Sequence, residues 1–165
     1  MEINITSGSA QDTKKVAKAL AGIVDFGDVL VVVGELGGGK TTFLSEFGRA
    51  FGVAEDITSP SFTIINIYGL KEGKRFVHID LYRLDNMEQI SNTEVEEYIE
   101  DDFSITCIEW GDKIAGHIKK DYLLIIFSYV LKEGEDTLNK RSIIIKSKSR
   151  YWDKKLRIIK DRLPK

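Results

Sequence analysis

Hydrophobic and polar positions change their period along this chain, and the changes predict where its elements lie. Residues 10–23 carry apolar side chains at helical spacing behind Ser9, a residue type that caps helices. Residues 28–34 form a continuous β-branched run without polar alternation, which predicts a strand buried on both faces of a parallel sheet. A glycine-rich turn then leads into residues 40–51, where an apolar helical stripe returns. The pattern predicts helix, buried strand, turn and helix.

The middle of the chain predicts a strand pair followed by acidic helical material. Residues 61–68 and 75–81 are extended segments, and the loop between them contains two glycines, which suits a hairpin. Residues 86–100 are rich in glutamate and keep a few apolar anchors at helical spacing. Further strands are expected at 103–109, 122–130 and 142–146. We therefore predict an α/β fold, a P-loop NTPase-like layered domain whose mixed, mostly parallel sheet is flanked by helices.

Length and composition limit the class of protein. A chain of 165 residues with 42% hydrophobic and 30% charged residues is typical of one globular domain. Its longest apolar stretch, residues 122–127, is far shorter than the roughly 20 residues that cross a bilayer, and no basic signal-type start is present. A single cysteine, Cys107, and two histidines predict neither a disulfide nor a zinc site. We expect a cytoplasmic protein with no membrane partner.

Charge is distributed unevenly along the sequence. Residues 1–139 hold 13 Lys/Arg and 24 Asp/Glu, whereas residues 140–165 hold 11 Lys/Arg and two Asp/Glu, so the formal net charges are −11 and +9. In the last fourteen residues apolar positions recur every three or four residues among lysines and arginines, which predicts a basic amphipathic helix. We divide the chain into a P-loop ATPase domain, residues 1–146, and a basic amphipathic C-terminal extension, residues 147–165.

Residues 34–41 read GELGGGKT and match G-x-x-x-x-G-K-[ST] between a predicted strand and a predicted helix. Glycines let successive backbone N–H groups point into one concavity, and the helix adds its positive dipole end. A polyphosphate fits such a cradle. Lys40 would supply a point charge to the β- and γ-phosphates, and the Thr41 hydroxyl a hard oxygen ligand for Mg²⁺.

The magnesium site of a P-loop protein also needs an acid at the end of a neighbouring apolar strand. Two strands end that way here, one in Asp80 and the other in Glu109. The residues alone leave open which acid holds the metal. Residues 58–63, with Ser61 among four hydroxyl side chains, are compatible with an ordinary turn. Their place after the P-loop helix also suits hydroxyls that reach the γ-phosphate or Mg²⁺.

Four short blocks occur in one order within residues 5–130. They read GELGGGKTTF at 34–43, SPSFT at 59–63, HIDLYRL at 78–84 and IEW at 108–110. In this order they resemble the TsaE (YjeE) family, small bacterial P-loop ATPases required to form N6-threonylcarbamoyladenosine on tRNA. Four ordered blocks are far more specific than a P-loop alone. The resemblance implies an ATP-binding, Mg²⁺-dependent hydrolase.

The resemblance also implies roles for individual residues. Thr41 and Glu109 would bind Mg²⁺, and Asp80 would act in hydrolysis together with Lys40, by orienting or deprotonating water. Trp110 would lie beside the site. By the same resemblance, the residues that contact ATP are Thr6 at the adenine, Gly37, Gly38, Gly39, Lys40, Thr41, Thr42 and Ser61 around the phosphates, Trp110, and the late contacts Gly134 and Arg141.

Three functions compete at this stage. The resemblance implies an ATPase that acts with a threonylcarbamoyl transferase subunit and its companion, proteins of the TsaD and TsaB type. A small-molecule kinase would share the P-loop and use Asp80 as a base, but a lid rich in arginines is not evident. A nucleotide-gated binding module with little turnover is the third. His78 and His117 are assigned no general-base role, because one lies within a strand and the other in a polar loop.

The C-terminal extension yields a separate hypothesis. Its cations would contact tRNA phosphate or an acidic partner surface, with Trp152 and Leu156 docking the helix. The competing interpretation is a helix packed on its own domain with a solvated basic face. The cations concerned are Lys146, Lys148, Arg150, Lys154, Lys155, Arg157, Lys160 and Arg162.

Overall fold

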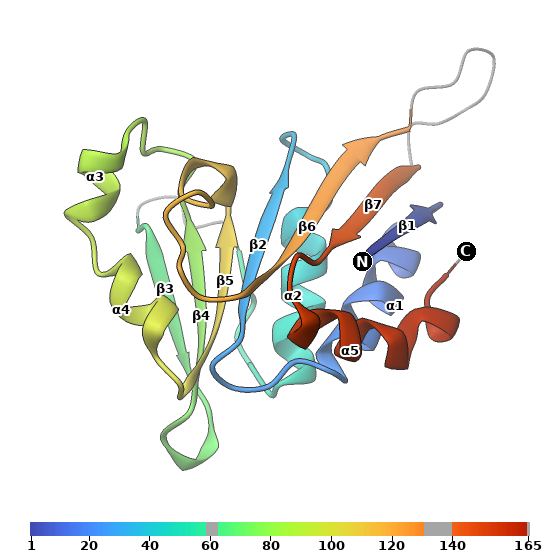
Figure 1. Ribbon diagram of the computed structural model, residues 1–165, viewed down its shortest axis with the longest axis horizontal. Helices are drawn as coiled ribbons and strands as arrows, with labels where there is room; N and C mark the ends of the chain where they lie inside the picture. The colour runs from blue at the N-terminus through green and yellow to red at the C-terminus, as the bar shows by residue number, and fades with distance from the viewer. Residues whose placement is uncertain (59–62, 131–139, 165) are drawn as a thin grey trace.

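A mixed sheet of seven strands runs through the protein, which a computed structural model describes over residues 1–58, 63–130 and 140–164. The strands lie side by side in the order first, seventh, sixth, second, fifth, fourth and third, and Figure 1 shows the sheet from one face. The strands are β1 (Glu2–Ser7), β2 (Val29–Gly34), β3 (Ile65–Gly69), β4 (Arg75–Asp80), β5 (Ser104–Glu109), β6 (Tyr122–Tyr129) and β7 (Arg141–Lys146).

The centre of the sheet is parallel and its margins are antiparallel. Strand β2 pairs in parallel with β5 and β6, and β5 pairs in parallel with β4. The pairs β1–β7, β6–β7 and β3–β4 are antiparallel. The predicted mixed sheet and the hairpin in the middle of the chain are therefore confirmed. The sequence prediction lacked β1, although Ile3 and Ile5 alternate with exposed polar residues in the way that a half-buried strand requires.

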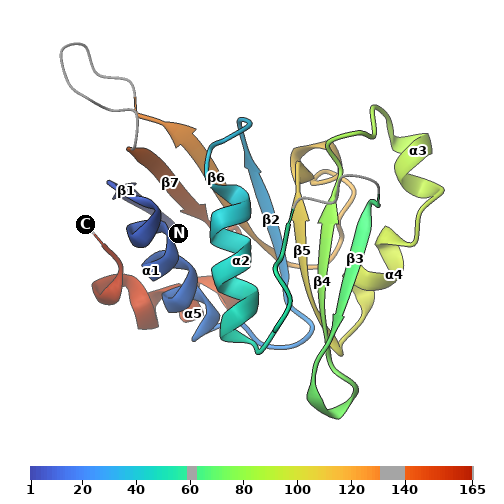
Figure 2. The same cartoon turned by 180° about the vertical axis from the view of Figure 1, so that it is seen from behind.

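Helices cover both faces of the sheet (Figures 1 and 2). The apolar sides of the first two helices and of the last share one buried cluster with β1, β2, β6 and β7. The two short helices that follow β4 cover the opposite face of β2, β4 and β5. No bilayer-spanning helix is found in the described part of the chain. The helices are α1 (Ala10–Ala21), α2 (Lys40–Ala50), α3 (Met87–Ser91), α4 (Val95–Glu100) and α5 (Arg150–Ile159).

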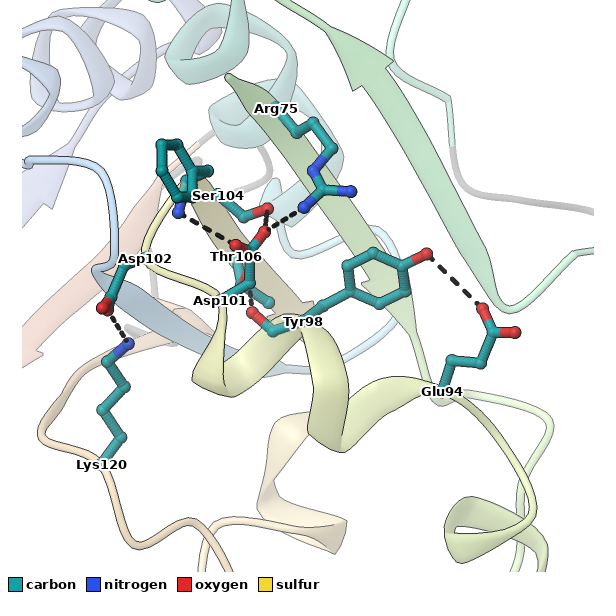
Figure 3. Close-up of polar contacts among 9 residues, drawn as sticks. Arg75, Glu94, Tyr98, Asp101, Asp102, Ser104, Thr106 and Lys120 are labelled. Atoms are coloured by element: carbon teal, nitrogen blue, oxygen red, sulfur yellow. Dashed lines mark hydrogen bonds and ion pairs between the residues drawn. The ribbon is translucent and has the colours of Figure 1, made fainter. Parts of the chain in front are cut away.

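Polar contacts hold the start of β5, the strand that ends in Glu109 (Figure 3). The Arg75 guanidinium lies 2.7 Å from Asp101 Oδ2, and the Ser104 hydroxyl donates to the same carboxylate. Burial opposes ionisation of Asp101, but these bonds outweigh it and lower its pKa. The Thr106 hydroxyl donates to the Tyr98 carbonyl over 2.7 Å. These contacts tie α4 and β4 to β5, which fixes the strand on which Glu109 sits.

Helix α5 packs on the same core as the P-loop helix α2. Its Ser149 N-cap accepts a hydrogen bond from the Trp152 backbone N–H at 3.3 Å. Trp152 and Leu156 are fully buried, in the positions where docking of the helix was expected. Burying a side chain of this size stabilises a fold by roughly 1.5–3 kcal/mol. The apolar face of α5 is therefore fully used inside the protein.

Candidate functional site

The turn between β2 and α2 adopts a backbone that favours glycine. Gly34, Gly37 and Gly39 have φ angles of +139°, +72° and +103°. A Cβ on Gly34 would lie 2.2 Å from the Phe127 carbonyl oxygen, and one on Gly38 would lie 2.9 Å from the Glu35 carbonyl oxygen. Larger residues at these positions would distort the loop. The glycines thus form the concave backbone cradle that the sequence motif predicts.

The cradle opens onto the first turn of α2. Gly39 is the N-cap of this helix and provides no side-chain cap, so the first backbone N–H groups of the helix face the loop. Unpaired N–H groups and the positive end of the helix dipole together favour an anion. This end of α2 is suited to phosphate.

Lys40 is a buried cation at the centre of the loop. Its Nζ donates to the carbonyl oxygens of Gly34 at 2.8 Å and Glu35 at 2.9 Å, and lies 4.4 Å from the centre of the Trp110 ring. Burial lowers the pKa of Lys40, and the negative charges of Glu109, Asp80 and Asp112 oppose that shift. Within the described residues, Lys40 forms no ion pair shorter than 4 Å. Its charge is therefore held by carbonyl dipoles and a ring face.

Two carboxylates and a hydroxyl converge beside the loop. The parallel register of β4 and β5 sets Asp80 directly opposite Glu109, and both are buried. Thr41 Oγ1, in the first turn of α2, lies 3.5 Å from Glu109 Oε1. The Asp80 carboxylate accepts the Tyr82 backbone N–H at 2.9 Å. Sheet register and the P-loop together place these three side chains at one point.

A cavity of about 220 Å³ joins these groups. It is lined by the loop backbone and by side chains from the ends of β4 and β5. Of the predicted site residues, the structure brings nine into this lining, and Leu36 and Tyr82 join them. The nine are Gly37, Gly38, Gly39, Lys40, Thr41, Thr42, Asp80, Glu109 and Trp110.

The donor set beside the loop suits magnesium rather than a softer metal. A hydroxyl and carboxylates are hard oxygen ligands, and Mg²⁺ binds through one or two carboxylates plus water and substrate phosphates. In the described ranges, no group of three or more His, Cys, Asp and Glu side chains is arranged to hold a metal by itself. Thr41 and Glu109 fit an ion whose remaining ligands come from the nucleotide and from water.

His78 was assigned no general-base role from the sequence, and its contact with Glu109 was not foreseen. It is fully buried on β4, and its Nε2 lies 3.0 Å from Glu109 Oε1. Because a carboxylate only accepts hydrogen bonds, Nε2 carries the proton and donates. The other ring nitrogen has no partner among the described residues. Its position two residues before Asp80, on the same strand face, was the available signal.

Trp110 adopts a strained backbone next to Glu109. Its φ angle is +57°, in the left-handed region that bulky side chains rarely occupy. The ring packs against the Tyr82 ring, with the two centres 5.1 Å apart, and against Lys40. Strain of this kind costs about 1–3 kcal/mol and persists where the surroundings hold it in place. Trp110 closes one wall of the cavity.

A second cavity of about 350 Å³ lies on the other side of the P-loop. Arg141 reaches it from β7, with Nη2 3.5 Å from the Gly37 carbonyl oxygen and Cζ 4.4 Å from the centre of the Tyr129 ring. The start of α1 forms the facing wall through Gly8, Ser9, Ala10 and Thr13.

The remaining predicted ATP contacts are Thr6, Ser61 and Gly134. Thr6 pairs with Ser142 on β1, and its side chain is exposed and outside the second cavity. The next residue, Ser7, is buried and shares a hydrogen bond of 2.8 Å with Thr13. Ser61 and Gly134 lie outside the described residues.

The chain is similar to known proteins of one family. The family model described as "Threonylcarbamoyl adenosine biosynthesis protein TsaE" matches residues 7–141. Two relatives bear the name "tRNA threonylcarbamoyladenosine biosynthesis protein TsaE". One, from Treponema pallidum, is 33% identical over 129 residues, 78% of this chain and 92% of the relative. The other, from Bacillus subtilis, is 32% identical over 127 residues, 76% and 75% of the two chains.

The fold also has a solved counterpart. The crystal structure of Bacillus subtilis YdiB superposes with a TM-score of 0.76 at 24% identity, covering 98% of this chain and 96% of that one. The α/β architecture described above is therefore shared with that structure over nearly the whole chain.

Proposed function

Because the chain belongs to the TsaE family of threonylcarbamoyl adenosine biosynthesis proteins, we propose that it is an Mg²⁺-dependent ATPase of tRNA threonylcarbamoyladenosine formation. The observation that carries the proposal is a single cavity. In it, the P-loop backbone, Lys40, Thr41, Asp80 and Glu109 converge. This set contains a phosphate cradle, a cation, metal ligands and a carboxylate for water, which is what phosphoryl transfer to water needs.

Each side chain has a distinct role in the proposed reaction. The N–H groups of residues 37–42 and Lys40 bind the phosphate oxygens and stabilise their charge. Thr41 and Glu109 hold Mg²⁺, which neutralises charge on the β- and γ-phosphates. Asp80 positions the attacking water and accepts its proton, since its carboxylate lies beside Glu109 at the edge of the cavity. Trp110 forms one wall of the cavity and keeps water out on that side.

The proposed working unit includes partners. Among the described residues, no arginine lines the first cavity. In P-loop enzymes of this kind, an arginine supplied by a partner protein stabilises the charge of the transition state and raises the rate of phosphoryl transfer. We infer that a threonylcarbamoyl transferase subunit of the TsaD type and its TsaB-type companion bind this protein and stimulate hydrolysis. The cytoplasm, where tRNA is modified, is the proposed location.

Steady-state ATP hydrolysis by the purified chain, with and without Mg²⁺ and with and without both partner subunits, tests the proposal. We expect Mg²⁺-dependent hydrolysis that the partners stimulate. Lys40→Ala should reduce it roughly 100-fold or more, because one charge-stabilising donor is lost. Lys15→Ala, at an exposed lysine of α1 outside both cavities, is the matched control and should leave the rate unchanged.

Two results would contradict the proposal. One is a rate that is equal in the wild-type chain and in Lys40→Ala, which would mean that the measured activity comes from elsewhere. The other is phosphoryl transfer that ignores the partner subunits and rises with a small hydroxylated metabolite, which would identify a kinase.

A further inference from the structure

Six Lys and Arg side chains on and around α5 face solvent. Among the described residues none of them has an ion pair within 4 Å, whereas nearby Lys146 and Lys155 pair with Glu2 at 3.1 Å and Asp28 at 2.6 Å. Lys146 and Lys155 thus form ion pairs within the protein, and the six other side chains form none among the described residues. We call the six the α5 basic surface: Lys148, Arg150, Lys154, Arg157, Lys160 and Arg162.

The α5 basic surface is a fixed array because its helix cannot move independently. Trp152, Leu156 and Ile159 on the opposite side of the helix are buried in the core. Arg150 and Lys154 are four residues apart, one turn along the same face, which corresponds to a rise of about 6 Å. A helix held in this way presents its cations without the entropy cost of ordering a mobile tail.

The positive surface extends beyond the helix. A cavity of about 160 Å³ at the start of α5 is lined by four lysines, two of which are engaged with acids. Lys120 lies 3.2 Å from Asp102 Oδ1 (Figure 3), and Lys146 pairs with Glu2. Lys119 has no such pair among the described residues, and it extends the α5 basic surface from Lys148 toward the start of β6.

The chemistry of this surface favours a phosphate backbone over other partners. Protein interfaces have an apolar core and are depleted in lysine, but the exposed side of α5 offers only Tyr151 and Ile158 as large apolar groups in its described part. A lipid bilayer would need the apolar face of the helix, which is already buried. Nucleic-acid interfaces are polar and strongly positive. The rest of the chain, at −11 over residues 1–139, repels RNA and restricts binding to this end.

We propose that the α5 basic surface, together with Lys119, binds the phosphate backbone of RNA. Resting on the proposed function, the RNA is the tRNA that this pathway modifies. Lys155 contacts Asp28, immediately before β2, so the surface lies at the opposite end of the sheet from the P-loop (Figure 1). ATP and RNA therefore bind without competing for space.

The test measures the affinity of the full chain for an unmodified tRNA transcript across a salt series. Replacing Arg150, Lys154 and Arg157 by Gln should weaken binding roughly 10- to 100-fold near 0.1 M salt. It should also reduce the slope of log K against log salt by about two to three, since each phosphate contact contributes about 0.7–0.9. The matched control replaces the exposed Lys15, Lys18 and Lys71 by Gln, the same change in charge, and should stay within about twofold of wild type.

Other outcomes separate this proposal from the proposed function. Equal tRNA affinity in the two triple variants, or no tRNA binding by the wild-type chain, overturns the RNA surface. Loss of affinity for the partner subunits with unchanged tRNA affinity also overturns it, in favour of an acidic protein surface. ATP hydrolysis is measured on the same variants, and a chain that binds tRNA through α5 but hydrolyses no ATP supports this surface while refuting the ATPase.

Discussion

The buried pair of His78 and Glu109 determines how the carboxylate that we propose as a Mg²⁺ ligand is oriented. Glu109 Oε1 accepts from His78 Nε2 at 3.0 Å, and Thr41 lies 3.5 Å from the same oxygen. Hydrogen bonds of this kind fix the orientation of a ligand and tune its affinity for a metal. His78 therefore acts as a positioning residue, because its contact is with Glu109.

We expect His78→Leu to raise the Mg²⁺ concentration for half-maximal ATP hydrolysis about 10- to 100-fold, the usual cost of removing such a support. The KM for ATP at saturating Mg²⁺ should change much less, because the P-loop is untouched. Titration of the rate with Mg²⁺ at several fixed ATP concentrations measures both quantities.

His78→Gln is the matched control, since its side-chain amide can place a donor near the original Nε2. It should restore most of the Mg²⁺ affinity. If the Leu and Gln variants have the same Mg²⁺ dependence, His78 only fills space in the core.

At the scale of residues, sequence predicts chemistry that depends on local spacing. The P-loop glycines and Lys40 are close together in the sequence, so a local motif was enough to predict that they share one loop. The contact between His78 and Glu109 depends on which strands pair and in which register, and a local motif does not predict that across a sequence separation of 31 residues. For Thr6, the structure shows an exposed side chain outside the second cavity, and a shift of one residue along a strand moves a side chain to the other face.

Helix α5 is fixed to the sheet by a charged contact as well as by its apolar face. Lys155 Nζ lies 2.6 Å from Asp28 Oδ2 and 2.9 Å from Asp25 Oδ2, and the Tyr151 hydroxyl donates to Asp28 Oδ1 at 2.7 Å. Burial opposes the charge of Lys155, but hydrogen bonds with Asp28, Tyr151 and Asp25 outweigh it and raise its pKa to about 12. The contact links the last helix to the start of β2.

Lys155→Met should lower the free energy of unfolding by about 3 kcal/mol, because it leaves the buried Asp28 carboxylate without its cation. Lys154→Met, at the exposed neighbouring position, should change it by no more than about 0.5 kcal/mol. Urea unfolding followed by tryptophan fluorescence measures both. Equal stabilities of the two variants would contradict a stabilising role for the Asp28 contact.

The same contact has a defined pH dependence. The folded pKa of Lys155 lies above its ordinary value of 10.5, so the pair contributes in full below pH 10.5 and is lost as pH rises through about 12. The stability difference between wild type and Lys155→Met should therefore stay constant from pH 7 to about pH 10. Unfolding curves across that range test it, and a difference that vanishes near neutral pH would refute the assignment.

At the scale of elements, hydrophobic periodicity predicted whether a segment is helix or strand better than it predicted which elements lie side by side. The apolar run of β2 and the apolar stripes of α1, α2 and α5 could be recognised in the sequence, because β2 is buried on both faces and each helix buries one continuous face. The N-terminal strand β1 was missed because it lies at the sheet edge and is paired with β7, more than 130 residues later in the chain. Long-range pairing of this kind leaves little trace in local sequence.

The whole molecule separates its two proposed binding regions along the sheet. The P-loop lies where β2, β4 and β5 end, and the α5 basic surface lies beside the segment in which β2 begins. A ligand that binds only the folded chain stabilises all of it by RT ln(1 + [L]/Kd), wherever its site is. The free energy of unfolding therefore measures whether nucleotide occupies the P-loop. It can be compared between the wild-type chain and variants at α5.

At 100 times its Kd, a non-hydrolysable ATP analogue with Mg²⁺ should stabilise the wild-type chain by about 2.7 kcal/mol, which raises Tm by roughly 5–10 °C. Lys40→Ala at the same concentration should show little of that shift, because it removes the cation of the cradle. The triple variant at Arg150, Lys154 and Arg157 should keep all of it, since these residues belong to α5, which lies at the far end of the sheet from the P-loop (Figure 1). Thermal melts of the three proteins measure this. A shift that is retained in Lys40→Ala but lost in the α5 variant would place nucleotide at α5, and both site assignments would then fail together.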